Sequence, residues 1–258
     1  MEDGTATARR IERAEAAQME RTLRASGTGD ALRIAGGLSA WTGPRSPFSV
    51  AIGCGLEGPV TPDDVDAIEA HLGRDGDPVR IEVSAFADPS LGVELGRRGY
   101  ALDRFQLVWA RPPLPAPEAP AAEVRAMRPD EEDLWIDLFA RAFWGGPAAE
   151  AMRDGLLAMP HGEGNVCFLA LADGMPAAVA MASAEGGVAQ LTGAGVAPRF
   201  RGRGLQLALV RTRLAWAAER GCDLAASACD PGTASQRTLE RAGFRLAYPK
   251  AVLVRQLP

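Results

Sequence analysis

The sequence of 258 residues is poor in several residue types that mark particular protein classes. It contains two histidines, two tyrosines and four cysteines, and aromatic residues make up 6% of the chain. The cysteines form no CxxC pair and show no metal-ligand spacing, so we expect four buried free thiols rather than disulfides. For the same reason we predict that the protein binds no metal. These cysteines are Cys54, Cys167, Cys222 and Cys229.

Long apolar runs and an excess of basic residues are also missing. No apolar run approaches the roughly 20 residues that a membrane-spanning helix needs. The first 24 residues are charged and helical in pattern, without the apolar core of a signal peptide. The formal net charge of −5 disfavours general binding to nucleic acid or to an anionic membrane. We therefore expect a cytoplasmic protein, a monomer or homodimer, that binds neither.

A proline-rich segment divides the chain. The length suits two domains, and residues 112–120 contain five prolines in nine positions, which stiffens the backbone into a spacer. We predict an N-terminal domain over 1–111, a linker over 112–122 and a C-terminal domain over 123–258.

The C-terminal segment alternates strand and helix patterns in the order of an α+β fold. Apolar segments bounded by glycine turns predict hairpins, and apolar residues three and four apart predict a long helix from Leu205 to about Arg220. In that helix we place Arg213 toward solvent. The predicted strands cover residues 123–127, 166–171, 176–183, 188–196, 223–229 and 246–255.

The ends of the two halves repeat each other. Residues 95–111 align with 239–255 at a constant offset, and the matches describe a helix end, its glycine cap and a following strand. The repeat predicts two related folds. The identical pairs are Leu95/Leu239, Arg97/Arg241, Gly99/Gly243, Leu102/Leu246, Val108/Val252 and Arg111/Arg255.

The segment Val196–Gly204 is the strongest functional signal. Its Arg199-x-x-Gly202-x-Gly204 turn lies between a predicted strand and a predicted helix. Backbone N–H groups and the helix dipole form an anion site there, and the two glycines permit a positive φ. Arg199, Arg201 and Arg203 add cations. We predict that a pyrophosphate binds at this turn.

The corresponding helix of the N-terminal half has no such turn. It begins at Thr61-Pro-Asp-Asp64, whose carboxylates would repel a phosphate. We expect this half to be a packing partner, or a wall of the acceptor site, rather than a second binding site for the same ligand.

Two motifs together resemble the GCN5-related N-acetyltransferase (GNAT) superfamily. They are Val-x-Pro-x-x-Arg-Gly-x-Gly at 196–204 and Ser-x-x-x-Leu-Glu-x-x-Gly-Phe at 235–244. The resemblance implies a tandem α/β sandwich of two GNAT-like domains, the first degenerate, each with a mixed, mostly antiparallel central sheet flanked by helices. It implies an acyltransferase that moves an acetyl or short acyl group from acyl-CoA to a primary amine, as in a small molecule, within a ternary complex.

The resemblance also implies which residues bind acetyl-CoA. The turn would hold the pyrophosphate, the backbone of Gly195 and Val196 would pair with the pantetheine arm, and Ser235 would lie near the cofactor. The expected pyrophosphate residues are Arg199, Phe200, Arg201, Gly202, Arg203, Gly204, Leu205 and Gln206.

The catalytic residues are not identified by the motifs. Leu239 occupies the position of the tyrosine that often protonates the leaving thiolate, Gly232 replaces a common asparagine, and residues 188–196 include no glutamate. His161, Glu185 and Tyr248 are weak candidates for acid or base, each also explained as a structural or solvated residue. Phe143 and Trp144 either line an acceptor site or close a helix end against the core.

Three other functions are alternatives to acyl transfer. The missing tyrosine and glutamate keep open the alternative of a non-catalytic acyl-CoA-binding or scaffold protein. A dinucleotide oxidoreductase is disfavoured because Leu207 occupies the place of a third glycine. An RNA-binding arginine–glycine segment is disfavoured because the acidic chain has a single copy.

Overall fold

The computed structural model describes residues 4–27, 29–112, 122–148 and 150–257, so most of the predicted linker lies outside the described residues. The helices are α1 (Gly4–Ser26), α2 (Pro62–Leu72), α3 (Pro89–Arg97), α4 (Glu132–Trp144), α5 (Glu150–His161), α6 (Leu205–Glu219) and α7 (Ala234–Arg241). The strands are β1 (Asp30–Ile34), β2 (Gly37–Trp41), β3 (Val50–Ile52), β4 (Val79–Ser84), β5 (Ala101–Arg111), β6 (Val124–Ala126), β7 (Val166–Ala172), β8 (Met175–Glu185), β9 (Val188–Val196), β10 (Leu224–Cys229) and β11 (Arg245–Arg255).

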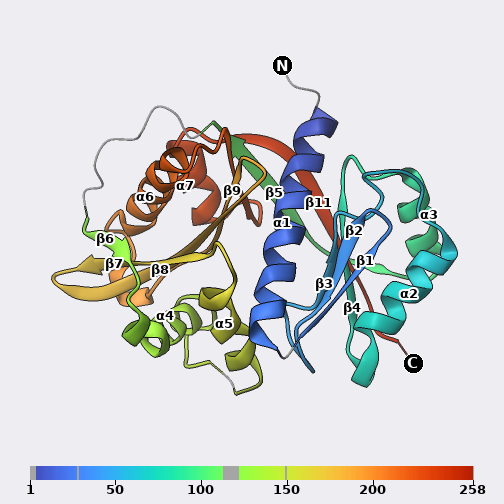
Figure 1. The fold of residues 1–258 in the computed structure, drawn as a ribbon, viewed down its shortest axis with the longest axis horizontal. Coiled ribbons are helices and arrows are strands. Elements are labelled where there is room, and N and C mark those ends of the chain that lie inside the picture. The colour runs from blue at the N-terminus through green and yellow to red at the C-terminus, as the bar shows by residue number, and fades with distance from the viewer. Residues whose placement is uncertain (1–3, 28, 113–121, 149, 258) are drawn as a thin grey trace.

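All of these strands form one mixed sheet with helices on its faces (Figure 1). The strand order is β1-β2-β3-β4-β11-β5-β10-β9-β8-β7-β6. The pairs β3–β4 and β9–β10 are parallel, and the other neighbours are antiparallel. This arrangement confirms the predicted fold class of a mixed, mostly antiparallel sheet flanked by helices.

The last strands of the two halves are exchanged within this sheet. The C-terminal strand β11 pairs with β4 and β5 of the N-terminal half, and β5 pairs with β10 of the C-terminal half. The sequence repeat maps onto the ends of α3 and α7 and the strands that follow them. Gly99 and Gly243 end these helices with φ of +77° and +81°, a conformation that glycine adopts without steric cost. In the sheet, β11 of the C-terminal half therefore lies between β4 and β5, and β5 of the N-terminal half lies between β11 and β10.

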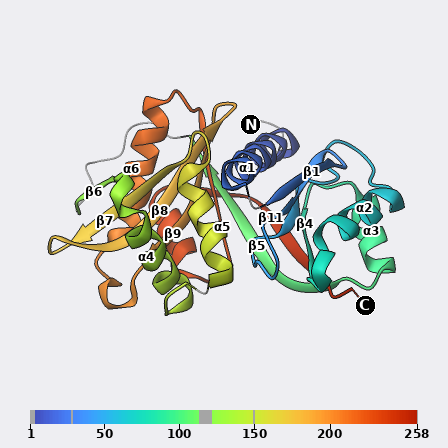
Figure 2. The same cartoon turned by 60° about the horizontal axis from the view of Figure 1, so that its bottom comes forward.

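Helix α1 lies across the junction of the two halves (Figures 1 and 2). It packs against α5, β8 and β9 on one side and against β1 and β2 on the other. Gln190 of β9 donates to the carbonyl of Ile11 at 2.8 Å, Arg13 pairs with Glu57 at 2.7 Å, and Arg10 pairs with Asp223. The helix thus contacts both halves through apolar packing and through polar bonds.

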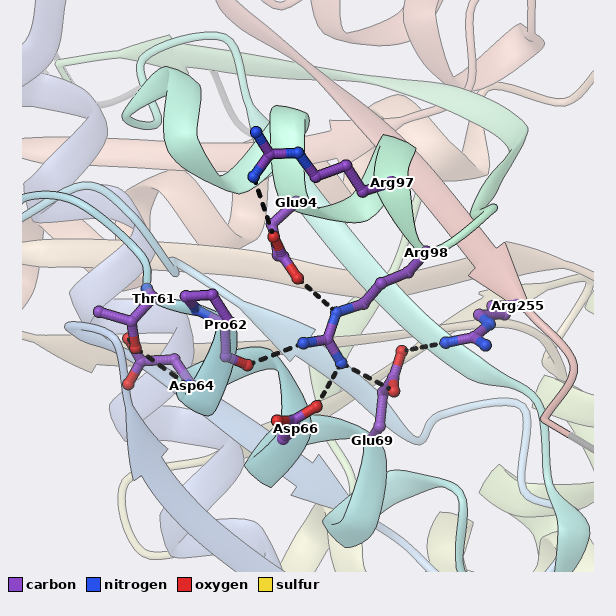
Figure 3. Close-up of polar contacts among 9 residues, drawn as sticks. All are labelled: Thr61, Pro62, Asp64, Asp66, Glu69, Glu94, Arg97, Arg98 and Arg255. Atoms are coloured by element: carbon purple, nitrogen blue, oxygen red, sulfur yellow. Dashed lines mark hydrogen bonds and ion pairs between the residues drawn. The ribbon is translucent and has the colours of Figure 1, made fainter.

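A charged network ties β11 to the N-terminal half (Figure 3). Arg98 at the end of α3 pairs with Asp66 and Glu69 of α2 and with Glu94 of α3. Arg255 of β11 also pairs with Glu69, at 2.8 Å. Arg255 thus links β11 to α2 of the N-terminal half.

The local predictions for the C-terminal half agree closely with the structure. The three consecutive strands and the long helix lie where the hydrophobic pattern places them. The four cysteines are buried and free, as expected. Helix α5 was not predicted, because Gly155 and Pro160 interrupt its pattern. No helix among the described residues is long and apolar enough to cross a membrane.

Candidate functional site

The glycine turn, residues 198–204, connects β9 to the N-terminus of α6. Gly202 and Gly204 have φ of +79° and +77°, and a Cβ at either would meet no atom within 4 Å. The positive φ, rather than crowding, is therefore what favours glycine here. The open space beside both residues leaves room for a ligand to approach the backbone.

Six consecutive backbone N–H groups at this turn have no hydrogen-bond acceptor in the described part of the chain. No described residue accepts a hydrogen bond from the N–H of residues 202–207, and Gly204 provides no side chain to cap α6. The first N–H of this region that is bonded is that of Ala208, which donates to the carbonyl of Gly204. Unpaired amides at a helix N-terminus form an anion site, to which the helix dipole adds.

The three arginines of the turn differ in their partners. Arg201 donates to the carbonyl oxygens of Ala142 and Val196, and Arg203 pairs with Asp173 at 2.6 Å. Arg199 stacks on the ring of Phe200 at 4.7 Å and has no ion-pair partner among the described residues. Of the three, Arg199 is the cation most available to a bound phosphate, while Arg201 fixes the turn to the end of α4.

Strands β9 and β10 separate next to this turn. Their parallel pairing covers only residues 188–190 and 224–226, and the hydroxyl of Ser227 donates to the carbonyl of Leu191 just beyond it. The edge of β9 from residue 192 to residue 196 faces no paired strand on that side, whereas its other edge pairs with β8. Gly195 and Val196 lie on this free edge.

A β-bulge marks the same stretch of β9. The register shifts between Val179 and Met181 on β8, which places Gly193 and Ala194 opposite the single residue Ala180. Gly193 has φ of +59°. A bulge of this kind bends the strand and redirects its backbone groups, so it contributes to the separation from β10.

Arg213 of α6 binds the carbonyl groups at this bulge. It is 1% exposed, which corrects our expectation that it faces solvent. Its Nη1 donates to the carbonyls of Met181 and Thr192 at 3.1 and 3.2 Å, and its Nε donates to Leu209. Burial lowers the pKa of Arg213 to about 9. The spacing of apolar residues along the helix predicts a solvent-facing position for Arg213, because the local sequence does not show that its guanidinium binds carbonyl groups of β8 and β9.

Helix α4 closes one wall of the site. A Cβ on Gly195 would lie 2.6 Å from Ala142 and 2.9 Å from Phe143, so only glycine allows this approach. The side chains of Phe143 and Trp144 are 50% and 42% exposed, and they are not core plugs. The ring of Trp144 lies edge-on to Phe48 of the N-terminal half at 6.2 Å.

A cavity of about 280 Å³ lies between the two halves. Its lining includes Thr192 and Gly193 at the bulge of β9, and Arg80 and Glu82 on β4, a strand that three other strands separate from β9 in the sheet. Helix α1 contributes Glu15 to its wall. Residues of both halves therefore line this cavity.

Lys250, the only lysine of the chain, is 1% exposed beneath this cavity. Its Nζ lies 2.8 Å from Glu12, 2.8 Å from Glu15 and 3.1 Å from Glu82. Burial raises the pKa of Glu12 and of Glu82, even though Lys250 opposes the shift. Burial alone would lower the pKa of Lys250, but the three carboxylates raise it well above its usual value.

The weak candidates for acid and base lie apart from the glycine turn. Tyr248 is 2% exposed and donates to Glu12 at 2.6 Å, and burial raises its pKa. His161 is exposed beside Glu132, and Glu185 pairs with Arg21. None of the three lines the cavity.

The two α7 residues of the second motif are placed differently. Ser235 is half-buried in the first turn of α7, beyond the end of β10. Leu239 is 2% exposed and packs in the core of the C-terminal half. The position at which the resemblance implies a proton-donating tyrosine is therefore occupied by a buried leucine.

The matching helix N-terminus of the N-terminal half is closed. Thr61 accepts a hydrogen bond from the N–H of Asp64, and the Asp64 carboxylate accepts one from the N–H of Thr61 (Figure 3). This capping box pairs two N–H groups at the start of α2, whereas the start of α6 has no such cap. The carboxylate of Asp64 also disfavours an anion at this end of α2.

Comparison with known proteins gives the family of the C-terminal half. Residues 127–244 match the acetyltransferase (GNAT) family, and the chain thus contains a GNAT domain. No curated protein is significantly similar in sequence. The family match supports acyl transfer from acyl-CoA.

Solved structures resemble the whole chain. A GCN5-related N-acetyltransferase from Kribbella flavida matches with a TM-score of 0.71 at 20% identity, over 97% of this chain and 96% of that one. A GCN5-related N-acetyltransferase from Sphaerobacter thermophilus matches with a TM-score of 0.59 at 19% identity, over 98% of this chain and 93% of that one. A tandem GNAT protein from the clavulanic acid biosynthesis pathway matches with a TM-score of 0.61 at 16% identity, over 93% of this chain and 87% of that one. The chain shares its overall fold with these structures.

Proposed function

We propose that the protein transfers an acetyl or other short acyl group from acyl-CoA to a primary amine of a small molecule, in a ternary complex. The observation that carries the proposal is the row of unpaired N–H groups at residues 202–207, beside the free edge of β9. The amides and Arg199 bind the pyrophosphate. The edge at Gly195 and Val196 pairs with the pantetheine arm, and Ser235 lies near the bound cofactor.

The thioester then lies near the bulge of β9, where one end of the cavity opens. A backbone N–H directed at the thioester carbonyl stabilises the charge that develops on its oxygen. Apolar side chains such as Phe48 and Met181 line the cavity there and remove water from the incoming amine, which favours its neutral, nucleophilic form.

The buried position of Leu239 is consistent with departure of CoA as a thiolate without a proton from the protein. Such a thiolate is a tolerable leaving group near neutral pH, so a missing acid slows the reaction without preventing it. The N-terminal unit takes no acyl-CoA in this proposal, because α2 is capped by its own side chains.

The test is release of CoA from acetyl-CoA in the presence of a panel of small primary amines, with matched alcohols as the control. Amine-dependent release supports the proposal. If acetyl-CoA binds and no amine accelerates its consumption, the protein is an acyl-CoA-binding or scaffold protein instead.

A further inference from the structure

The floor of the cavity is the exchanged part of the sheet. On β4, Arg80 and Glu82 are two residues apart and point to the same face, roughly 7 Å from each other. Across the floor, Glu82 lies opposite Val252 of β11, which lies opposite Arg104 of β5. The N-terminal half therefore supplies charged side chains of both signs to a cavity that ends at the bulge of the C-terminal half.

The acidic side of this floor carries three carboxylates. Glu12, Glu15 and Glu82 share one ammonium group, that of Lys250. Glu15 and Glu82 each bind it through Oε2, and the other oxygen of each has no partner among the described residues. These two glutamates line the cavity, so the free oxygens are available to a cationic or hydrogen-bond-donating group.

The basic side of the floor is also open. Arg104 pairs with Asp103 at 2.5 Å and with Asp230 at 3.7 Å. Arg80 lines the same cavity and has no ion-pair or hydrogen-bond partner within the described ranges. An unpaired, half-buried guanidinium is suited to binding a carboxylate in a two-pronged geometry.

Unpaired polar atoms lie elsewhere in the cavity as well. Gln18 is 6% exposed and donates to Thr22 through Nε2, and its Oε1 is without a partner in the described part of the chain. At the bulge, the buried hydroxyl of Thr192 has none either. Apolar side chains such as Ile52 and Met159 line the space as well. This distribution suits an elongated ligand with polar ends and an apolar middle.

We infer that the acceptor is a primary amine whose far end is an amino acid head group. Its carboxylate binds Arg80, its α-ammonium binds the free oxygens of Glu82 and Glu15, and its reacting amine lies beside Thr192 and Gly193. The inference rests on the proposed function, and it assigns the acceptor class from residues of the N-terminal half.

The reaction on such an acceptor is a simple acyl transfer. The neutral terminal amine attacks the thioester carbonyl, a C–N bond forms, and the C–S bond breaks. The electron pair of that bond leaves with sulfur as the CoA thiolate. The amine proton passes to solvent, so that one amide and CoA are produced from one amine and acyl-CoA.

The experiment compares three acceptors that share a primary amine on a five-carbon chain: L-lysine, cadaverine and 6-aminohexanoate. Cadaverine lacks the carboxylate and 6-aminohexanoate lacks the α-ammonium. We expect kcat/KM with acetyl-CoA to be roughly 10- to 100-fold higher for L-lysine than for either, since each loses a charged hydrogen bond.

Variants then assign each charge. Arg80→Gln should lower kcat/KM for L-lysine by at least about tenfold and leave cadaverine unchanged. Glu82→Gln should lower it for L-lysine and leave 6-aminohexanoate unchanged. The control is Arg97→Gln, an exposed arginine on α3 outside the cavity. Because Arg80 has no polar partner among the described residues, Arg80→Gln should fold normally, and it tests the inference even if Glu82→Gln does not fold.

Two results would overturn the inference while acyl transfer stands. In one, wild-type protein acetylates cadaverine at least as well as L-lysine, or Arg80→Gln keeps the preference. In the other, acetyl-CoA binds and other amines are acetylated, but none of these three is. Failure of the proposed function looks different, because then no amine of any class accelerates CoA release.

Discussion

Lys250 on the last strand donates a hydrogen bond to Glu82 on β4, with Nζ and Oε2 3.1 Å apart. The bond crosses from the C-terminal segment of the chain to its N-terminal half and lies beneath the cavity. Glu12 and Glu15 of α1 share the same ammonium group. One buried cation therefore links strand β11 to strand β4 and to helix α1, next to the cavity.

Removal of that cation should destabilise the protein in a pH-dependent way. Lys250→Met leaves the carboxylates of Glu12, Glu15 and Glu82 uncompensated, and we expect a loss of about 3–5 kcal/mol at pH 8. Burial already raises the pKa of Glu12 and Glu82, so their contribution is present at low pH and is lost as pH rises through the folded-state pKa. The loss should therefore be smaller at pH 5.

Denaturant unfolding of wild type and Lys250→Met at pH 5 and pH 8 measures this difference. Arg33→Met, which breaks an exposed pair with Glu20, is the control and should cost little at either pH. An equal loss at both pH values would show that the carboxylates do not titrate in the variant.

The exchange of β5 and β11 makes the two halves interdependent. A fragment of residues 123–258 alone would expose β11 without β4 or β5, and β10 without β5. We expect this fragment to aggregate or to remain unfolded, because unpaired edge strands and an open core are exposed. Co-expression of residues 1–112 with 122–258 should restore a soluble complex, as judged by co-purification and circular dichroism.

The opposite result is equally clear. If 123–258 alone unfolds cooperatively as a monomer, the predicted domains fold independently and the exchange is not required for stability.

We predict that Arg213 stabilises the bulge of β9 and thereby supports the rate of acyl transfer. Arg213→Met keeps an apolar stem and leaves the carbonyls of Met181 and Thr192 without a donor, at an expected cost of about 1–3 kcal/mol. The bulge should then relax, and kcat should fall by roughly tenfold, equivalent to 1.36 kcal/mol in the barrier. Arg211→Met, on the same helix, is the matched control. An unchanged kcat with a lowered midpoint would limit Arg213 to a structural role.

The parts of the site that the sequence predicts are local. The glycine turn, the strand before it and the helix after it occupy 188–219, and the sequence pattern of each is read within a few residues. The repeat at 95–111 and 239–255 predicts two related folds. It does not predict the exchange, because either pairing of the final strands satisfies the same alternation of buried and exposed residues.

The cavity depends on contacts between distant residues. Glu15 and Lys250 are 235 residues apart in the chain, and no periodicity links them. Alternation along 79–84 indicates a half-buried strand but does not say that Arg80 and Glu82 face a cavity. The one sequence feature that points to this cluster is that only one of the 28 basic residues is a lysine. This choice indicates a position that requires a compact ammonium group rather than a guanidinium.

The central claim is that the glycine turn binds acyl-CoA, and thermal unfolding with and without saturating acetyl-CoA tests it most directly. Acetyl-CoA at 100 times its Kd should stabilise the wild type by about 2.7 kcal/mol. Gly204→Glu places a carboxylate beside the free amides and should abolish the shift. Gly76→Glu, also at a positive φ in open space, should keep it and so controls for backbone strain. A wild-type midpoint that acetyl-CoA does not move, or a Gly204→Glu variant that it still stabilises fully, would contradict the account.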